Sequence, residues 1–271
     1  MMKGIVKAVA TAMLLPPLIF GSSCMADAAQ ITLKPSAASQ MFTAQSGNQQ
    51  GLATDGHYVW ISYDAGGGKA KIATYTWKGQ YMGTSKALPL GHAAELDYRV
   101  RDKSLYVANG GLESESVSAN TKVYRVTLDI HAVAKSVVQT YDFSWMGRNG
   151  LVAVDNRHDQ LITMGGPDAG PWKVSIHNFN HAAANTALKN FIVSDPGVLL
   201  QGLAYVDGLL WVYVSQGSVN RIDKFDTTGT LLSQTTLPFT GEAEGLTVNP
   251  LTGSVYVGAH SGNRVLRVSG V

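Results

Sequence analysis

Short runs in which apolar and polar residues alternate recur along most of the chain, and a period of two predicts β-strands. Examples are "YVWISY" from Tyr58 and "LLWVYV" from Leu209, both rich in the β-branched and aromatic residues that strands favour. Turns rich in Asp, Asn, Gly or Pro separate neighbouring runs, which is the signature of hairpins. No long segment has a helical period, although "HAAANTALKN" could form one short helical turn. The pattern predicts an all-β protein.

The runs belong to a repeat. Five segments can be written under one another: "QGLATDGHYVWISYD" from Gln50, "AELDYRVRDKSLYVANG" from Ala94, "NGLVAVDNRHDQLITMGG" from Asn149, "QGLAYVDGLLWVYVSQG" from Gln201 and "EGLTVNPLTGSVYVGAH" from Glu244. A leucine keeps its register in all five, at Leu52, Leu96, Leu151, Leu203 and Leu246. Successive leucines of this series are 44, 55, 52 and 43 residues apart, which is in the range of the repeat lengths of propeller blades. The repeat therefore predicts a five-bladed β-propeller; two stacked β-sandwiches are the alternative.

Each unit continues into a third run, and the first four add a fourth run that the last unit lacks. The third runs are "KIATYTW", "KVYRVTL", "WKVSIHNF", "RIDKFD" and "RVLRV". A blade of three strands leaves an open edge, so another part of the chain has to supply its partner. We expect the segment "QITLKP" at residues 30–35 to pair with the last blade and close the ring.

The first 28 residues differ from the rest. Lys3 and Lys7 precede an apolar run over residues 8–20, and Ala26-Asp27-Ala28 supplies small residues for a cleavage site. This pattern predicts a signal peptide over 1–28, a single domain over 29–271, and a secreted or periplasmic protein. A lipid anchor on Cys24, the only cysteine, is the weaker alternative because Gly21 stands where an aliphatic residue is expected.

The net charge of the chain limits the kinds of partner it is expected to bind. The formal net charge is +2 and no basic run follows the signal, which argues against nucleic acid as a partner. After signal removal no second apolar span remains to cross a membrane.

Propeller topology brings the loops before the inner strands together at one mouth of the channel, where rigid scaffolds usually carry function. We expect ligand-binding residues among these loops and the aromatic residues beside them: Gln50, His92, Glu95, Trp145, Arg148, Asn149, Trp172, Gln201, Glu242 and Glu244. Amides and carboxylates around a mouth can bind a sugar, and exposed indole rings could stack on its face. The alternative is that the polar groups bond backbone groups of neighbouring blades and fasten the ring.

Catalytic and metal motifs are not evident. His92 has no second histidine at ligand spacing, and no acidic series of the calcium-binding type occurs, so we expect no metal and no cofactor. His158 falls on a turn expected at the opposite face.

The units "QGLATDGHYVWISYD", "GHAAELDYRVRDKSLYVANG" and "FTGEAEGLTVNPLTGSVYVG" resemble the five-bladed propellers of the teichoic-acid biosynthesis protein C, phage receptor-binding and helveticin-like group. This resemblance implies a non-catalytic protein that binds a carbohydrate or another component of the cell envelope, or a protein partner.

The "QGL" phrases are also similar to the secreted propeller enzymes of the glutaminyl cyclotransferase and lactonase types. The ordered acidic motifs of the cyclotransferases have no counterpart along these blades. The sequence thus favours binding and leaves catalysis open.

Overall fold

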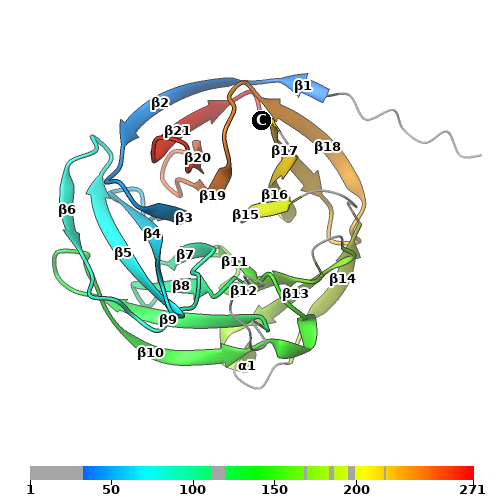
Figure 1. Cartoon of the computed structure of the whole chain (residues 1–271). Helices are drawn as coiled ribbons and strands as arrows, with labels where there is room; N and C mark the ends of the chain where they lie inside the picture. Colours follow the sequence, from blue (N-terminus) through cyan, green and yellow to red (C-terminus); the bar gives the residue numbers. More distant parts are fainter. Residues whose placement is uncertain (1–32, 111–119, 168–169, 183–185, 195–198, 217) are drawn as a thin grey trace, which may run out of the picture. The chain divides into compact units, whose positions relative to one another are not determined.

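The computed structural model describes residues 33–110, 120–167, 170–182, 186–194, 199–216 and 218–271. The expected signal peptide over 1–28 lies outside these residues. The described part of the chain forms five antiparallel sheets arranged as a five-bladed β-propeller (Figure 1). The predicted fold class is therefore confirmed.

Each sheet runs from an inner strand outward and contains one of the five sequence repeats. The first comprises β3 (Asn48–Thr54), β4 (Tyr58–Gly66), β5 (Lys69–Thr76) and β6 (Tyr81–Thr84). The second comprises β7 (Glu95–Arg99), β8 (Ser104–Ala108), β9 (Lys122–Leu128) and β10 (Ala134–Asp142). The third comprises β11 (Leu151–Asp155), β12 (Gln160–Gly165), β13 (Trp172–Asn178) and β14 (Lys189–Val193). The fourth comprises β15 (Leu199–Val206), β16 (Leu209–Gln216), β17 (Val219–Phe225) and β18 (Leu231–Leu237). The fifth comprises β19 (Ala243–Val248), β20 (Val255–Ala259) and β21 (Arg264–Ser269), with β2 (Ala37–Thr43) outermost.

The hydrophobic core is divided among the five spaces between neighbouring sheets. Side chains that alternate along a strand point to its two faces, so each sheet contributes to two of these spaces. Trp60 of the first sheet, for example, stacks on Tyr98 of the second with 5.1 Å between ring centroids. A further cluster joins Tyr63 and Tyr75 of the first sheet to Tyr256 of the last. The five leucines in register are all buried in the inner strands, with at most 2% of each exposed.

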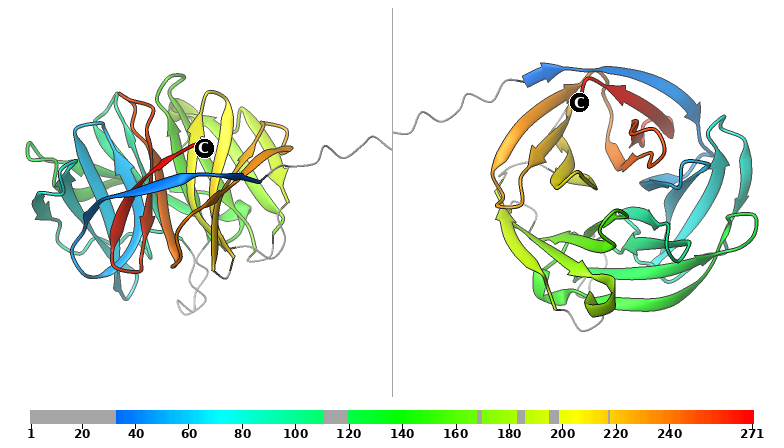
Figure 2. Two further views of the ribbon diagram at one scale, coloured as in Figure 1. Left: turned by 90° about the horizontal axis from the view of Figure 1, so that it is seen from above. Right: turned by 180° about the vertical axis from the view of Figure 1, so that it is seen from behind.

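The N-terminal strands correct one expectation. We expected residues 30–35 to supply the missing strand of the last sheet, but β1 (Leu33–Pro35) pairs in parallel with β18 of the fourth sheet. The strand that pairs antiparallel with β21 is β2, from Ala37↔Ser269 to Thr43↔Arg264. Figures 1 and 2 show β1 and β2 following one another along the outside of these two sheets. That this pairing keeps the ring closed stays a prediction.

Helix is almost absent. The described residues contain one 3-10 turn, η1 (Ser144–Met146), and one short helix, α1 (Phe179–Ala182), which overlaps the segment where a helical turn was expected only at His181 and Ala182. Neither has the length or apolar character that crossing a membrane requires, and the rest of the described chain offers no such helix.

Candidate functional site

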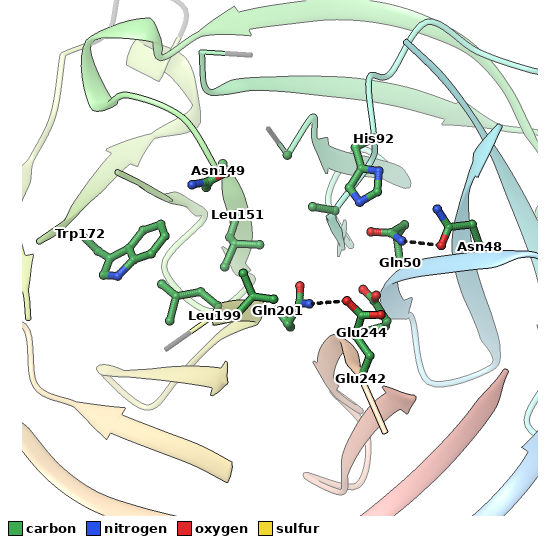
Figure 3. Close-up of a pocket in the computed structure, with 14 residues that line it drawn as sticks. Asn48, Gln50, His92, Asn149, Leu151, Trp172, Leu199, Gln201, Glu242 and Glu244 are labelled. Carbon is green, nitrogen blue, oxygen red and sulfur yellow. Dashed lines mark hydrogen bonds between the residues drawn. The ribbon is translucent and has the colours of Figure 1, made fainter. Parts of the chain in front are cut away.

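A cavity of about 270 Å³ opens where the inner strands begin (Figure 3). Seven of the ten residues expected at the site line it: Gln50, His92, Asn149, Trp172, Gln201, Glu242 and Glu244. Asn48, Ala94, Leu151, Leu199 and Leu200 are among the others. The cavity therefore draws residues from all five sheets, as expected for a channel mouth.

The repeat explains why these residues meet. In every unit the side chain two places before the register leucine lines the cavity, which gives the series Gln50, Ala94, Asn149, Gln201 and Glu244. Residues two apart on a strand share a face, and equivalent positions of equivalent strands share a place around the axis. One position per blade thus sets the chemistry of the mouth.

Glu95 has a different place from the one expected. It is fully buried and does not line the cavity. Its Oε1 accepts the backbone N–H groups of Leu52 (3.1 Å) and Leu96 (2.9 Å), and its Oε2 accepts those of Leu203 and Leu246 (both 3.0 Å). Four register leucines from four different blades therefore converge on one carboxyl group. The fastening role that the sequence had suggested for the amides belongs to this side chain.

Glycine makes this convergence possible. In the other four units the residue before the register leucine is glycine, where the second unit has Glu95. A Cβ on Gly202 would lie 2.7 Å from the Leu246 nitrogen and 3.0 Å from Oε2 of Glu95. Gly245, with φ of +79°, would meet the Leu52 nitrogen at 2.5 Å. Side chains at these positions would push the inner strands apart, so the space they leave is filled by a single carboxyl group.

Two further carboxyl groups face the cavity from the last unit. Gln201 donates from Nε2 to Oε1 of Glu242 at 3.4 Å, and Glu242 is exposed. Glu244 is 3% exposed, and its carboxyl has no hydrogen bond or ion pair within the described residues. Burial raises the pKa of Glu244 well above its usual range, and the nearby carboxylates of Glu242 and Glu95 raise it further. Glu244 is therefore poised to hold a proton or to meet a positive charge.

His92 lines the same cavity and is oriented by a carboxylate. Its Nδ1 lies 3.0 Å from Oδ2 of Asp64, and 13% of each side chain is exposed. Asp64 lies near the end of β4, opposite Asn48 at the start of the inner strand β3, which brings its carboxylate to this mouth of the channel. An imidazole held this way presents its other nitrogen as a base or a hydrogen-bonding group.

The opposite wall of the cavity is apolar. Figure 3 shows Trp172, Leu151 and Leu199 facing the polar side chains of His92, Gln50 and Glu244 across the opening. Trp172 is only 1% exposed, so it forms part of a wall and not the open platform that was expected. Trp145 and Arg148 are exposed but do not line the cavity, because they belong to η1 and the turn that follows it.

A second cavity of about 290 Å³ lies where the inner strands end. It is lined by Asp97, Asp155 and His158 among others, which confirms that His158 lies on the opposite face. Asp97 accepts the N–H groups of Tyr98 and of Val154 from the next sheet, both at 2.7 Å. Burial raises the pKa of Asp97 to about 7, against these two hydrogen bonds. Sequence reasoning missed Asp97, although its place two residues after Glu95 puts both on one strand face.

Across the described residues no group of three or more His, Cys, Asp or Glu side chains is arranged to hold a metal ion.

Comparison with known proteins gives relatives in structure alone. No protein-family model matches the sequence. No curated protein matches it by sequence either. Among solved structures, the glutaminyl cyclase of Myxococcus xanthus is similar with a TM-score of 0.58 at 13% identity, over 88% of this chain and 97% of that one. The tail fiber of Staphylococcus aureus phage P68 is similar with a TM-score of 0.57 at 14% identity, over 86% of this chain and 52% of that one. This chain therefore spans about half the length of the tail fiber.

A third structure, the GH43 endo-arabinanase from Bacillus licheniformis, has a TM-score of 0.50 at 11% identity, over 84% of this chain and 96% of that one. At such identities the likeness shows the propeller fold and nothing finer. The neighbours include a phage fiber and enzymes, so the fold accommodates both binding and catalysis.

Proposed function

We propose that the protein is an exported, non-catalytic binding propeller whose ligand, a carbohydrate or another cell-envelope component, occupies the cavity at the start of the inner strands. The observation that carries the proposal is the two-sided lining of this cavity. Amide and carboxyl groups that form directional hydrogen bonds face a wall of Trp172, Leu151 and Leu199. A sugar ring has the same division, with hydroxyl groups at its edge and C–H groups on its faces.

Export rests on the expected signal peptide, and a cell-envelope ligand suits a protein outside the cytoplasm. The resemblance to the teichoic-acid, phage receptor-binding and helveticin-like propellers supports the same class of ligand. Arg148 and Trp145 precede Asn149 closely in the chain and are exposed. We assign them to contacts with a ligand long enough to extend beyond the cavity.

A glycan array, followed by titration of the strongest hit, tests this function. Gln201→Leu removes a partly buried amide from the cavity without emptying the core, so we expect it to weaken binding at least tenfold. Gln234→Leu provides the matched control, because it makes the same change in a half-buried glutamine of the outer strand β18, away from the cavity, and should leave binding intact. A protein that binds no glycan and no isolated cell wall, or whose binding Gln201→Leu leaves intact, would refute the proposal.

The pair of His92 and Asp64 favours one alternative, an enzyme of this fold that uses the imidazole as a base. The resemblance to secreted propeller enzymes points the same way. The distinguishing experiment is His92→Gln: loss of turnover of a bound ligand with unchanged affinity indicates catalysis, whereas a binding protein turns over nothing in either form.

A further inference from the structure

The charge on the cavity lining is one-sided. Glu242 and Glu244 face the opening, Glu95 lies buried beneath it, and none of the described residues lining it is Lys or Arg. Glu244 is shielded from solvent, and a carboxyl group removed from water interacts more strongly with a charge than the same group in solvent. The mouth therefore attracts positive charge.

The second observation is that Glu244 is buried without a partner. Its neighbour Glu95 has all its acceptor positions filled by N–H groups, whereas Glu244 has no hydrogen bond or ion pair within the described residues. An unpaired buried carboxyl group costs free energy, so the fold by itself would favour an apolar residue or an amide here. The missing partner is one that a ligand can supply from the cavity.

We infer that the ligand carries a protonated primary amino group, which binds between Glu244 and Glu242 while the apolar side of the ligand packs on Trp172 and Leu199. The inference rests on the proposed function and names its ligand class, a saccharide with an unacylated amino group. The ammonium group donates to both carboxylates, and such charge-assisted hydrogen bonds are stronger than neutral ones.

Binding is then coupled to a proton. The titratable and charged groups around Glu244 are Glu242, Glu95 of β7, Tyr213 of β16 and His92 of the same cavity. Because the pKa of Glu244 is raised, the empty site holds a proton there that the ammonium group displaces. Below that pKa the affinity should rise about tenfold for each pH unit, and above it the affinity should level off.

Calorimetric titration with four probes separates the possibilities. Glucosamine has the sugar ring and the amine, glucose has the ring alone, N-acetylglucosamine has the ring with a neutral amide, and ethylamine has the amine alone. Titrations between about pH 5 and 7 keep the amines protonated, and paired buffers of different ionisation enthalpy report the released proton. We expect glucosamine to bind most tightly, with release of about one proton below the raised pKa.

Glu244→Gln is the decisive variant, since it removes the charge and loses no hydrogen bond that the folded chain makes. It should weaken glucosamine at least tenfold, abolish the proton release and leave glucose unchanged. The control is Asp207→Asn, which also removes one carboxylate but from the cavity at the other end of the inner strands, where Asp207 is 81% exposed. It should change neither quantity. Near-ultraviolet circular dichroism confirms that both variants are folded.

Each result decides between the two claims. Glucose and N-acetylglucosamine binding as tightly as glucosamine would overturn the amine inference and leave the carbohydrate function standing. Ethylamine binding in a Glu244-dependent way without any sugar binding would keep the cation site and overturn the carbohydrate function. If none of the four probes binds, both claims are contradicted. They are also contradicted if the protein binds calcium, loses that binding in Glu244→Gln, and binds neither amine.

Discussion

Replacing Glu95 tests whether one side chain holds the propeller together at its axis. In Glu95→Ala the N–H groups of Leu52, Leu96, Leu203 and Leu246 all lose their acceptor. A buried donor left unsatisfied costs about 1–3 kcal/mol. The lower end of that range for each of the four gives about 4 kcal/mol, a large part of the roughly 5–15 kcal/mol by which domains are stable.

A competing effect acts in the other direction. Burial raises the pKa of Glu95, so a charge there is costly and its removal recovers part of the loss. That recovery is limited, because the four N–H groups stabilise the charged carboxylate and lower its pKa against the effect of burial. Glu95→Gln separates the two effects, since it is neutral and keeps one acceptor oxygen but turns an NH₂ group toward two of the donors. We expect it to lose roughly half as much stability as Glu95→Ala.

Urea and thermal unfolding measure the difference. For a domain of this size about 1 kcal/mol corresponds to roughly 2–4 °C, so Glu95→Ala should lower the Tm by about 8–16 °C. Glu244→Gln is the matched control: it is the same chemical change in a neighbouring buried carboxyl group that makes no hydrogen bond to the rest of the described chain. If Glu95→Gln and Glu244→Gln shift the Tm equally and in the same direction, the role given to the four N–H groups is wrong.

Three other outcomes are expected. Glu244→Gln should raise stability by about 1–3 kcal/mol at neutral pH. Because the raised pKa makes wild-type stability fall as pH rises from about 4.5 through that pKa, the gain should vanish in acid, which urea titration at several pH values checks. In the folded state the pKa of Asp97 is raised from 3.8 to about 7, so the stability of the wild type falls as the pH rises from about 4 to about 7. Asp97→Asn should remove this part of the pH dependence. An unchanged slope of stability against pH in that window would contradict the role given to Asp97. Deleting the N-terminal residues through Thr43 should lower the Tm far more than deleting them through Ser36, because β2 pairs with β21 and buries Phe42 whereas β1 adds only an outer edge to β18. Equal effects in thermal unfolding would argue against closure by β2.

The ring of five sheets could be predicted because its signals are local. Alternation within each hairpin fixes which side chains point inward, and the register leucines mark the inner strands without any knowledge of distant contacts. The N-terminal strand could not be placed as well, because an outer strand buries little. Only Phe42 of β2 is buried, so β2 has no clear alternation of apolar and polar residues. The hydrophobic pattern therefore could not distinguish β2 from the preceding segment "QITLKP" as the partner of the last sheet.

The candidate site was predictable in position and less so in role. The series before the register leucines gave the residues of the mouth, since equivalent positions share a place around the axis. The function of Glu95 depends on N–H groups 43, 108 and 151 residues away in the chain, and no local pattern encodes such contacts. Trp145 and Trp172 likewise both stand beside glycine-rich loops, and only the packed sheets show that one is exposed outside the cavity and the other forms its wall.

The contrast between Glu95 and Glu244 separates stability from function within one repeat. Both are buried carboxyl groups with raised pKa values, and they lie near enough that Glu95 contributes to the shift of Glu244. A perturbed pKa alone would mark both as functional candidates. Hydrogen bonding divides them: Glu95 satisfies four backbone donors of the scaffold, whereas Glu244, one position earlier in its unit, lines the cavity and satisfies none in the described chain. Side chains one residue apart on a strand point to opposite faces. The carboxyl group one position before the register leucine therefore binds the backbone of neighbouring blades, whereas the one two positions before it faces the cavity and is free to contact a ligand.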